Sequence, residues 1–338
     1  MQANGKISEQ PFDVLIVGAG MAGLSAAAEL QRTGRQVVLI DKGRSVGGRM
    51  ATRRIGAAIF DHGAQFFTAR TPRFAAAIAH WQEIGVAGEW SRGFTKEADG
   101  HPRWRGRPGM TAVAKQLAWE FEIVLETEIE AIRREEEQWN IETAAGEIFH
   151  ARALVLTPPV PQSLALLEAG EIALPPEAWK RLTRIRYERC LAVMAVLVGP
   201  SRVPAPGGFA PAVGPIAWIA DNQQKGISAA PAVTIHATHA FSLEHWERDR
   251  QESGRLLLSA AREWLGADVT TFQVHGWRYS RPMEVDAQPC AILSESPPLV
   301  LAGDAFAGPR VEGAALSGWA AAKAVMRAEK STPQFHFA

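Results

Sequence analysis

The chain contains few cysteines. Only Cys190 and Cys290 occur among 338 residues, and they form no Cys-x-x-Cys pair. Two isolated cysteines exclude a disulfide framework, and their spacing does not suit a cysteine-based metal site. We therefore expect no bound metal and a chain suited to a reducing compartment.

An excess of charge of one sign is also missing. Acidic and basic residues number 36 each, so the formal net charge at pH 7 is +0. Proteins that bind nucleic acid or anionic membranes through a whole domain usually carry a basic excess. The balance favours a small-molecule partner and predicts neither a nucleic-acid nor a membrane partner.

Long apolar runs are absent as well. No stretch reaches the roughly 20 apolar residues of a membrane span, and residues 1–11 lack the basic start and apolar run of a signal peptide. The sequence therefore predicts a cytoplasmic protein. Its length, with 47% hydrophobic residues, suggests about two domains.

The N-terminal sequence contains a strand–helix–strand pattern. Residues 12–18 form an apolar run closed by glycine, which is typical of a buried parallel strand. Residues 21–33 are rich in alanine and leucine and fit a helix, and residues 36–40 form a second apolar run. This order predicts the βαβ unit of a Rossmann-like domain.

A GxGxxG motif lies between the first strand and the helix, and Asp41 follows it. In this context the motif predicts a dinucleotide site. Gly18 makes the tight turn, Gly20 lets the backbone approach the pyrophosphate, and Gly23 lets helix and strand pack closely. The N–H groups at the start of the helix suit phosphate, and Asp41 suits ribose hydroxyls. The cofactor contacts predicted here are Gly18, Ala19, Gly20, Ala22, Gly23 and Asp41.

Residues 41–50, DKGRSVGGRM, carry a further signal. They resemble the extension after the second strand in flavoproteins of the amine oxidase, phytoene desaturase and renalase superfamily, where the GGR segment wraps the FAD pyrophosphate. A guanidinium suits that role because it can donate two parallel hydrogen bonds to phosphate. The resemblance implies non-covalent FAD. The contacts it implies in this segment are Lys42, Gly48, Arg49 and Met50.

Three later segments resemble the renalase branch, particularly its bacterial members. They are residues 60–70 (FDHGAQFFTAR), 104–110 (WRGRPGM) and 303–313 (GDAFAGPRVEG). The similarity covers nearly the whole chain, although residues 160–290 match mainly in pattern. The further cofactor contacts it implies are Ala64, Gln65, Ile129, Gly303, Asp304 and Val311. The substrate contacts it implies are Phe66, Phe67, Thr68, Ala69, Arg70, Trp104 and Arg310.

These signals predict an α/β protein with a Rossmann-like FAD-binding domain and a second, mixed α+β substrate domain, as in the two-domain flavoproteins of the amine oxidase and renalase type. The predicted FAD-binding domain is discontinuous and comprises residues 11–72, 105–160 and 296–330. The predicted substrate domain comprises residues 73–104 and 161–295. We expect a monomer or a weak homodimer.

The resemblance also implies a reaction. Isomeric dihydronicotinamide forms of NAD(P)H would be oxidised to NAD(P)+ by hydride transfer to FAD, with oxygen as acceptor and hydrogen peroxide as product. FAD carries such chemistry, so no catalytic side chain is expected.

Two alternatives stay open. One is a flavin amine oxidase or a related C–N or C–C oxidase, enzymes that usually have an aromatic cage and a lysine-bound water at the flavin. For these the chain offers only two tyrosines, Tyr187 and Tyr279, and few mid-chain lysines, Lys180 and Lys225. The other alternative is a flavin-binding protein without turnover.

Overall fold

The computed structural model of the protein describes residues 10–94 and 99–331. The chain forms two compact units. Unit 1 runs up to Gly48, continues over Ala114–Arg186 and resumes at Pro282. Unit 2 comprises Arg49–Val113 and Tyr187–Arg281.

Unit 1 is built on an eight-stranded sheet with a parallel centre. The strand order is β16-β17-β10-β1-β2-β7, and β9 and β8 extend antiparallel from β10. The central strand β1 pairs in parallel with β10 and β2, and five of its six residues are buried. Its strands are β1 (Phe12–Val17), β2 (Val37–Ile40), β7 (Glu122–Val124), β8 (Ile129–Glu135), β9 (Gln138–Thr143), β10 (Ile148–Leu156), β16 (Ala291–Glu295) and β17 (Pro298–Leu301).

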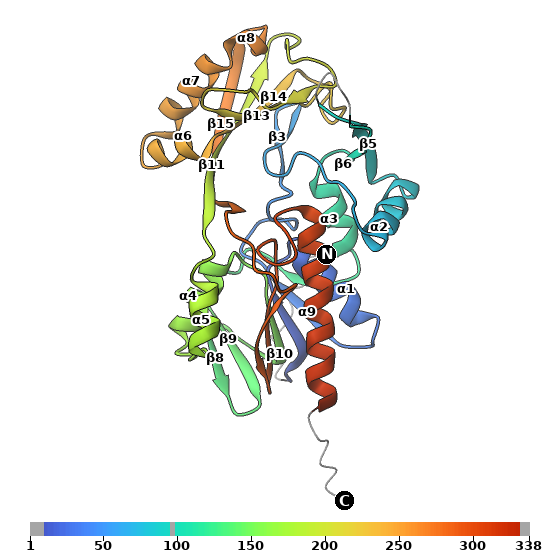
Figure 1. The fold of residues 1–338 in the computed structure, drawn as a ribbon, viewed down its shortest axis with the longest axis vertical. Helices are drawn as coiled ribbons and strands as arrows, with labels where there is room; N and C mark the ends of the chain where they lie inside the picture. The colour runs from blue at the N-terminus through green and yellow to red at the C-terminus, as the bar shows by residue number, and fades with distance from the viewer. Residues whose placement is uncertain (1–9, 95–98, 332–338) are drawn as a thin grey trace, which may run out of the picture. The chain divides into compact units, whose positions relative to one another are not determined.

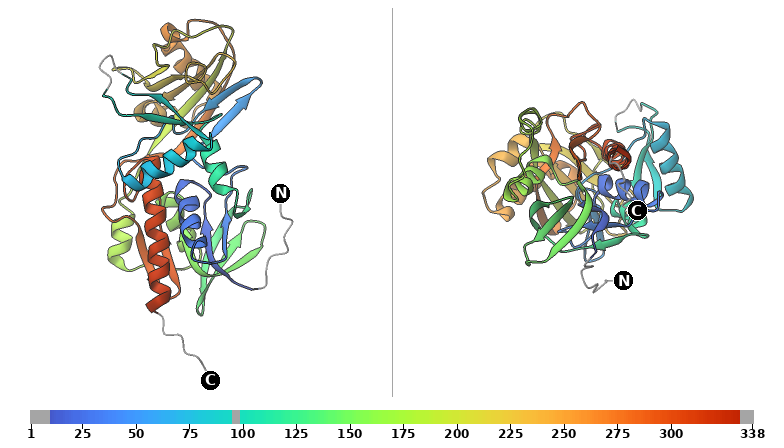
Figure 2. Two further views of the ribbon diagram at one scale, coloured as in Figure 1. Left: turned by 90° about the vertical axis from the view of Figure 1, so that its right-hand side faces the viewer. Right: turned by 90° about the horizontal axis from the view of Figure 1, so that it is seen from below.

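Helices α1 (Met21–Gln31) and α9 (Val311–Ser331) lie side by side in unit 1 (Figures 1 and 2). Both contribute to the same apolar core as β1 and β2. A Cβ at Gly318 of α9 would collide with the carbonyl oxygen of Ala22 in α1, so glycine permits this close approach. The other helices of this unit are α4 (Val160–Ala169) and α5 (Pro176–Leu182), and α3 (Thr111–Ala118) crosses from unit 2 into unit 1.

Unit 2 contains a five-stranded sheet, with strand order β12-β13-β14-β11-β15, and two short hairpins. Helices α6, α7 and α8 lie on one face of this sheet (Figure 1). The strands are β3 (Thr52–Ile55), β4 (Ala58–Asp61), β5 (Ala87–Ser91), β6 (Arg103–Gly106), β11 (Tyr187–Leu197), β12 (Gly208–Phe209), β13 (Ile216–Asp221), β14 (Ala232–Ala237) and β15 (Val269–Pro282). The helices are α2 (Pro72–Glu83), α6 (His239–Glu244), α7 (Arg250–Ala260) and α8 (Arg262–Leu265).

The compact units and the predicted domains divide the chain differently. Residues 49–72 and 105–113 belong to unit 2, whereas residues 161–186 and 282–295 belong to unit 1. The β3–β4 hairpin explains the first difference, because its Phe60 packs with Met194 and Ala232 of the five-stranded sheet. These are contacts over a long sequence separation, which a local pattern does not reveal.

The predicted fold class is confirmed, since a Rossmann-like α/β unit is joined to a second unit of mixed α and β structure. Within the described ranges, no helix combines the length and apolar character needed to cross a membrane.

Candidate cofactor and substrate sites

Two glycines fix the shape of the loop between β1 and α1. Gly18 has a φ of +100°, and a Cβ there would strike the side chain of Thr157. A Cβ on Gly23 would collide with the carbonyl oxygen of Gly18. Both positions therefore need glycine for the turn itself, as the sequence predicts.

Gly20 is surrounded differently, because a Cβ there would meet nothing within 4 Å among the described atoms. Helix α1 begins directly after Gly20 without a side-chain cap, so its first N–H groups face this open space. Gly48 borders the same space, since a Cβ on it would lie 3.7 Å from Gly20 Cα. Open backbone at an uncapped helix N-terminus fits a pyrophosphate.

Asp41 holds two loops of unit 1 together. Its Oδ2 accepts a 2.6 Å hydrogen bond from Ala19 N, and its Oδ1 accepts a 2.7 Å bond from Gly43 N. Gly47 N also donates to Ala19 O at 2.8 Å, which adds another hydrogen bond between the same two loops. The carboxylate thus orders the phosphate loop, and its predicted bond to ribose stays a prediction.

The C-terminal motif of unit 1 brings Asp304 to the start of α9. Gly303 has a φ of +148°, and its N–H donates to Ser317 Oγ at 2.9 Å. Asp304 is 9% exposed, and Val311 opens the helix. Ile129 is buried at the start of β8, whereas Lys42 is exposed and pairs with Glu128. The roles predicted for these residues stay predictions.

In unit 2, the segment that begins at Arg49 runs beside residues 61–65. Ala64 N donates to Arg49 O at 2.8 Å, and a Cβ on Gly63 would collide with that oxygen. Arg49 Nη1 donates to Tyr279 O and Ser280 O, each at 3.3 Å. Met50 is buried beside α3, where its carbonyl accepts from Thr111 Oγ1 at 2.9 Å. The pyrophosphate contact predicted for Arg49 and the flavin contacts predicted for Met50, Ala64 and Gln65 stay predictions.

Lys225 and Asp61 form a fully buried ion pair in unit 2. Lys225 Nζ lies 2.7 Å from Asp61 Oδ2, and both side chains are 0% exposed. Asp61 Oδ1 accepts hydrogen bonds from Thr52 Oγ1 at 2.6 Å and from Met110 N at 2.8 Å. Burial lowers the pKa of the Lys225 ammonium, and the Asp61 carboxylate opposes that shift. The ammonium is committed to Asp61 and to the face of Trp90, whose ring centre lies 4.8 Å away.

A tight turn after β13 places Lys225. Asp221 Oδ1 accepts from the backbone N–H groups of Gln223 and Gln224 at 2.8 and 2.9 Å, and Asp221 O accepts from Lys225 N at 2.9 Å. An aspartate that bonds its own following backbone is a common turn device. The turn is therefore specified locally, whereas its partner Asp61 is distant in sequence.

Gln65 and His236 are neighbours in unit 2, with Gln65 Nε2 3.5 Å from His236 Nε2. Gln65 Nε2 donates to Asp61 O at 2.7 Å and to Gly63 O at 3.1 Å, which fixes the amide orientation. Gln65 Oε1 is buried and has no hydrogen-bond partner among the residues that the structure describes. His236 Nε2 lies 3.1 Å from His62 O, which favours the tautomer that carries its proton on Nε2.

Three histidines of unit 2 are neutral at physiological pH. Burial lowers the pKa of His62 to about 3 and the pKa values of His236 and His275 to about 4. The ring of Trp277 stacks on His62 with centres 5.3 Å apart, and its Nε1 donates to His62 O at 2.7 Å. The region of unit 2 around His62 therefore contains neutral imidazoles of low pKa and the aromatic ring of Trp277.

Phe66 belongs to an aromatic cluster, which we define as Phe66, Trp90, Phe94 and Trp218. Its ring centre lies 6.3 Å from Trp90, 5.2 Å from Phe94 and 5.8 Å from Trp218. Phe94 also contacts both tryptophans edge-on, at 4.8 and 4.9 Å. Such clusters supply flat apolar surface to a planar ligand.

The structure distributes the other predicted substrate residues over several places. Phe67 is buried and packs edge-on against Phe74 and Trp81, so its ring serves the core under α2. Trp104 pairs with Phe67 through the backbone. Thr68 and Ala69 are half-buried, whereas Arg70 and the unit 1 residue Arg310 are exposed. No comparison tests these assignments, and they stay predictions.

Sequence reasoning missed several members of this arrangement. Trp90, Phe94, Trp218 and the Asp61–Lys225 pair are not among the site residues that the sequence predicts. Trp90 sits in a short strand, and Lys225 sits in a turn rich in polar residues. Neither position carries a periodic signal, so only the tertiary contacts reveal them.

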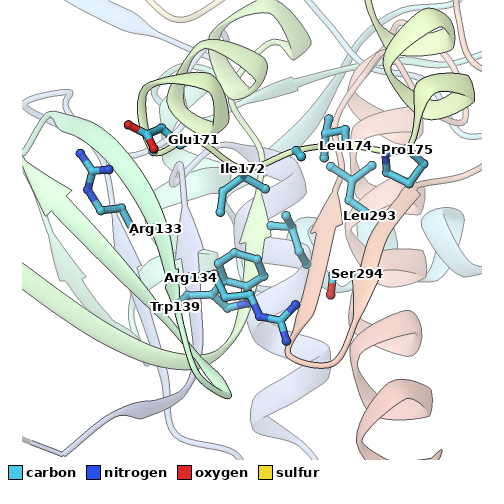
Figure 3. Close-up of a pocket in the computed structure, with 12 residues that line it drawn as sticks. Arg133, Arg134, Trp139, Glu171, Ile172, Leu174, Pro175, Leu293 and Ser294 are labelled. Atoms are coloured by element: carbon cyan, nitrogen blue, oxygen red, sulfur yellow. The ribbon is translucent and has the colours of Figure 1, made fainter.

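Unit 1 also has a cavity of about 640 Å³ between β8, β9, β16 and residues 170–175 (Figure 3). Its arginines are engaged elsewhere, since Arg133 Nε bonds Glu142 at 2.8 Å and Arg134 Nε bonds Glu136 O at 3.2 Å. Trp139 Nε1 donates to Pro298 O at 3.0 Å. No residue of the predicted cofactor or substrate sites lines this cavity.

Comparisons with known proteins identify the family of the chain. Residues 16–81 match the NAD(P)-binding Rossmann-like domain, and residues 75–326 match the flavin containing amine oxidoreductase family. The putative flavin-containing monoamine oxidase AofH of Mycobacterium tuberculosis (strain ATCC 25618 / H37Rv) is 40% identical over 74 residues, which cover 22% of this chain. An L-amino acid oxidase of Cerastes cerastes is 51% identical over 47 residues, or 14% of this chain. The chain spans only 16% and 9% of these relatives.

Solved structures share the fold over most of the chain. A putrescine oxidase variant matches with a TM-score of 0.70 and 15% identity over 94% of this chain and 99% of that chain. A putative protoporphyrinogen oxidase of Exiguobacterium sp. 255-15 matches with a TM-score of 0.67 and 15% identity, over 95% of this chain and 99% of that chain. Since the family model covers about three quarters of the chain, and since the open glycine loop fits a dinucleotide, the chain belongs to the flavin containing amine oxidoreductase family and has FAD as its cofactor.

Proposed function

We propose that this chain is a renalase-like oxidoreductase that oxidises isomeric dihydronicotinamide forms of NAD(P)H to NAD(P)+. The observation that carries the proposal is the commitment of Lys225 to Asp61 at 2.7 Å, beside an aromatic cluster. The cluster offers faces for a planar ring, and the paired lysine offers no free base.

The need for a base separates the two main reactions. An alkylamine has a pKa of roughly 10 and must lose a proton before it can give up a hydride. A dihydronicotinamide needs no deprotonation before hydride transfer. Its ring nitrogen donates electron density as the hydride leaves, and the product is a pyridinium cation. His62 and His236, with pKa values of about 3 and 4, are poor bases for an ammonium group. The described residues therefore suit the second reaction better.

The tyrosines support the same choice. Tyr187 and Tyr279 lie 5.6 Å apart with their planes at 84°, so they contact each other edge-on. Two parallel rings that flank a substrate amine need a different geometry. The names of the relatives favour amine oxidation, and this remains the second candidate.

Residues of the chain have separate roles in cofactor and substrate binding under this proposal. Gly20 and Gly48 leave room for a pyrophosphate, and Asp41 keeps the loop in that shape. FAD, when bound, supplies the hydride acceptor, and oxygen regenerates it with release of hydrogen peroxide. Gln65 presents a buried acceptor oxygen with a fixed orientation, which suits the N–H of a substrate carboxamide.

The test is anaerobic mixing of the FAD-loaded protein with three kinds of reductant. These are equilibrated NAD(P)H that contains the 2- and 6-dihydro isomers, pure 4-dihydro NADH, and a panel of amines that includes putrescine and L-amino acids. Rapid flavin bleaching by the isomers alone is the expected result. Bleaching by an amine transfers the assignment to amine oxidation, and an oxidised flavin with every reductant leaves a flavin-binding protein without turnover.

A further inference from the structure

Arg105 combines burial with unused hydrogen-bonding capacity. Its Nε and Nη1 are buried, and within residues 10–94 and 99–331 neither has a hydrogen-bond partner. A buried donor without a partner destabilises the folded state, and a charged donor does so more strongly than a neutral one. The guanidinium therefore has capacity for a ligand that accepts hydrogen bonds.

The surroundings of Arg105 carry excess positive charge. Lys225 is near enough for Arg105 to lower its pKa, and Asp61 is the one carboxylate that acts on both cations. Because Asp61 already bonds Lys225, Thr52 and Met110, it is used by other groups. Arg107 also acts on Arg105, so among the described residues one carboxylate stands against three cations, and the net positive charge favours an anion.

The chain also clears space for this guanidinium. Arg105 Nη2 lies 2.8 Å from the position that a Cβ would take on Gly226, so the neighbouring turn needs glycine. On β5, the register partner of Arg105 is Gly88, where a Cβ would instead meet the guanidinium of Arg107, so a second arginine lies beside this strand pair. Trp90 joins this region to the aromatic cluster, because it contacts both Lys225 and Trp218.

The indole of Trp218 supplies a second unused donor. Its Nε1 is buried and has no partner in the described part of the chain. Trp90 Nε1, in contrast, donates to Pro206 O at 2.8 Å. Unused buried donors therefore occur on Trp218, which contacts Trp90, and on Arg105, which lies beside Gly226 next to Lys225.

We infer that Arg105 binds an anionic oxygen group, a carboxylate or a phosphate, of the planar molecule that the aromatic cluster receives. The inference rests on the proposed function for the planar ring, and it adds which side chain holds the anionic group of that substrate. Arginine suits this role because its fork bonds carboxylate and phosphate in two parallel contacts.

Isothermal titration calorimetry on the FAD-loaded protein tests this inference without turnover. The probes are nicotinate, nicotinamide mononucleotide and neutral nicotinamide. Nicotinate carries its anion on the ring, and the mononucleotide carries a phosphate, so the preferred probe identifies the source of the anion. We expect at least one anion to bind more tightly than nicotinamide, and Arg105→Gln to weaken it 10- to 100-fold without affecting nicotinamide.

Arg255→Gln is the matched control, because Arg255 is an exposed arginine of α7 in the same unit and does not act on the charge of Arg105 or Lys225. We expect it to change anion affinity less than threefold. Arg105→Lys keeps the positive charge but loses the two parallel hydrogen bonds of the guanidinium. We expect it to weaken anion binding less than Arg105→Gln does, and it provides a second test if Arg105→Gln fails to fold. Equal losses in the Arg105 and Arg255 variants, anions that bind no better than nicotinamide, or no binding of any probe would each overturn the inference. Bleaching by dihydronicotinamide isomers is a separate measurement, so either proposal can fail alone.

Discussion

At the scale of single residues, substitutions at Gly20 and Gly23 of the loop between β1 and α1 should affect different properties. The first should affect FAD binding, and the second should affect folding stability. Gly20 has an extended backbone, with φ of −81° and ψ of −176°, which any residue can adopt. Gly20→Ala therefore leaves the unfolding free energy unchanged or raises it by about 0.4–1 kcal/mol. Its methyl group enters the open space, so we expect FAD affinity to fall about tenfold or more.

Gly23→Ala is the comparison, because its methyl group strikes the Gly18 carbonyl. We expect it to lower the unfolding free energy by about 1–3 kcal/mol. Urea unfolding of the apoprotein and quenching of FAD fluorescence measure the two quantities. Unchanged FAD affinity in Gly20→Ala would refute the assignment of this space to the pyrophosphate.

The Asp61–Lys225 pair gives the second prediction for single residues. Lys225→Met leaves the Asp61 carboxylate buried without its partner, and breaking a buried pair costs about 3–5 kcal/mol. Replacing both residues, as Asp61→Asn with Lys225→Met, removes the isolated charge and should recover part of this loss. Urea unfolding provides the measurement. Lys180→Met, at an exposed lysine, is the control. A loss below about 1 kcal/mol in Lys225→Met would contradict the prediction.

Helix packing in unit 1 gives a prediction for whole elements. In an isolated helix, alanine is more favourable than glycine by about 1 kcal/mol. At Gly318 the sign reverses, because the methyl group collides with the Ala22 carbonyl and forces α9 away from α1. We expect Gly318→Ala to lower the unfolding free energy by about 1–3 kcal/mol. Lys323→Ala, on the exposed side of α9, should change it by less than about 0.5 kcal/mol. Equal stability of the two variants would show that the helices tolerate separation.

Elements with a local signal were predictable, and contacts between distant segments were not. The strand ending at Val17, the helix beginning at Met21 and the glycine loop follow from apolar period and turn chemistry within thirty residues. The aromatic cluster joins residues 66, 90, 94 and 218, and no local pattern encodes such a contact. The same limit explains why the pairing of Asp61 with Lys225 was not predictable from the sequence.

At the scale of the whole molecule, buried histidines make stability depend on pH. Burial lowers the pKa of His236 from its ordinary value of 6.5 to about 4. Between these values the unfolded state binds the proton and the folded state does not, so stability falls as pH falls. The contribution is fully present above pH 6.5 and is lost toward pH 4. At 1.36 kcal/mol per pKa unit, His236 accounts for up to about 3 kcal/mol.

His236→Gln should therefore flatten the dependence of stability on pH. We expect the unfolding free energy of the FAD-loaded protein to rise between pH 4.5 and 7 and then to level off. In His236→Gln that rise should shrink, whereas His80→Gln, at an exposed histidine, should leave it unchanged. Urea unfolding at constant excess FAD measures the curves. Because His62 titrates still lower, with a pKa of about 3, part of the slope should persist in the His236 variant. A His236→Gln curve that superimposes on the unsubstituted one would show that folding does not lower the pKa of His236.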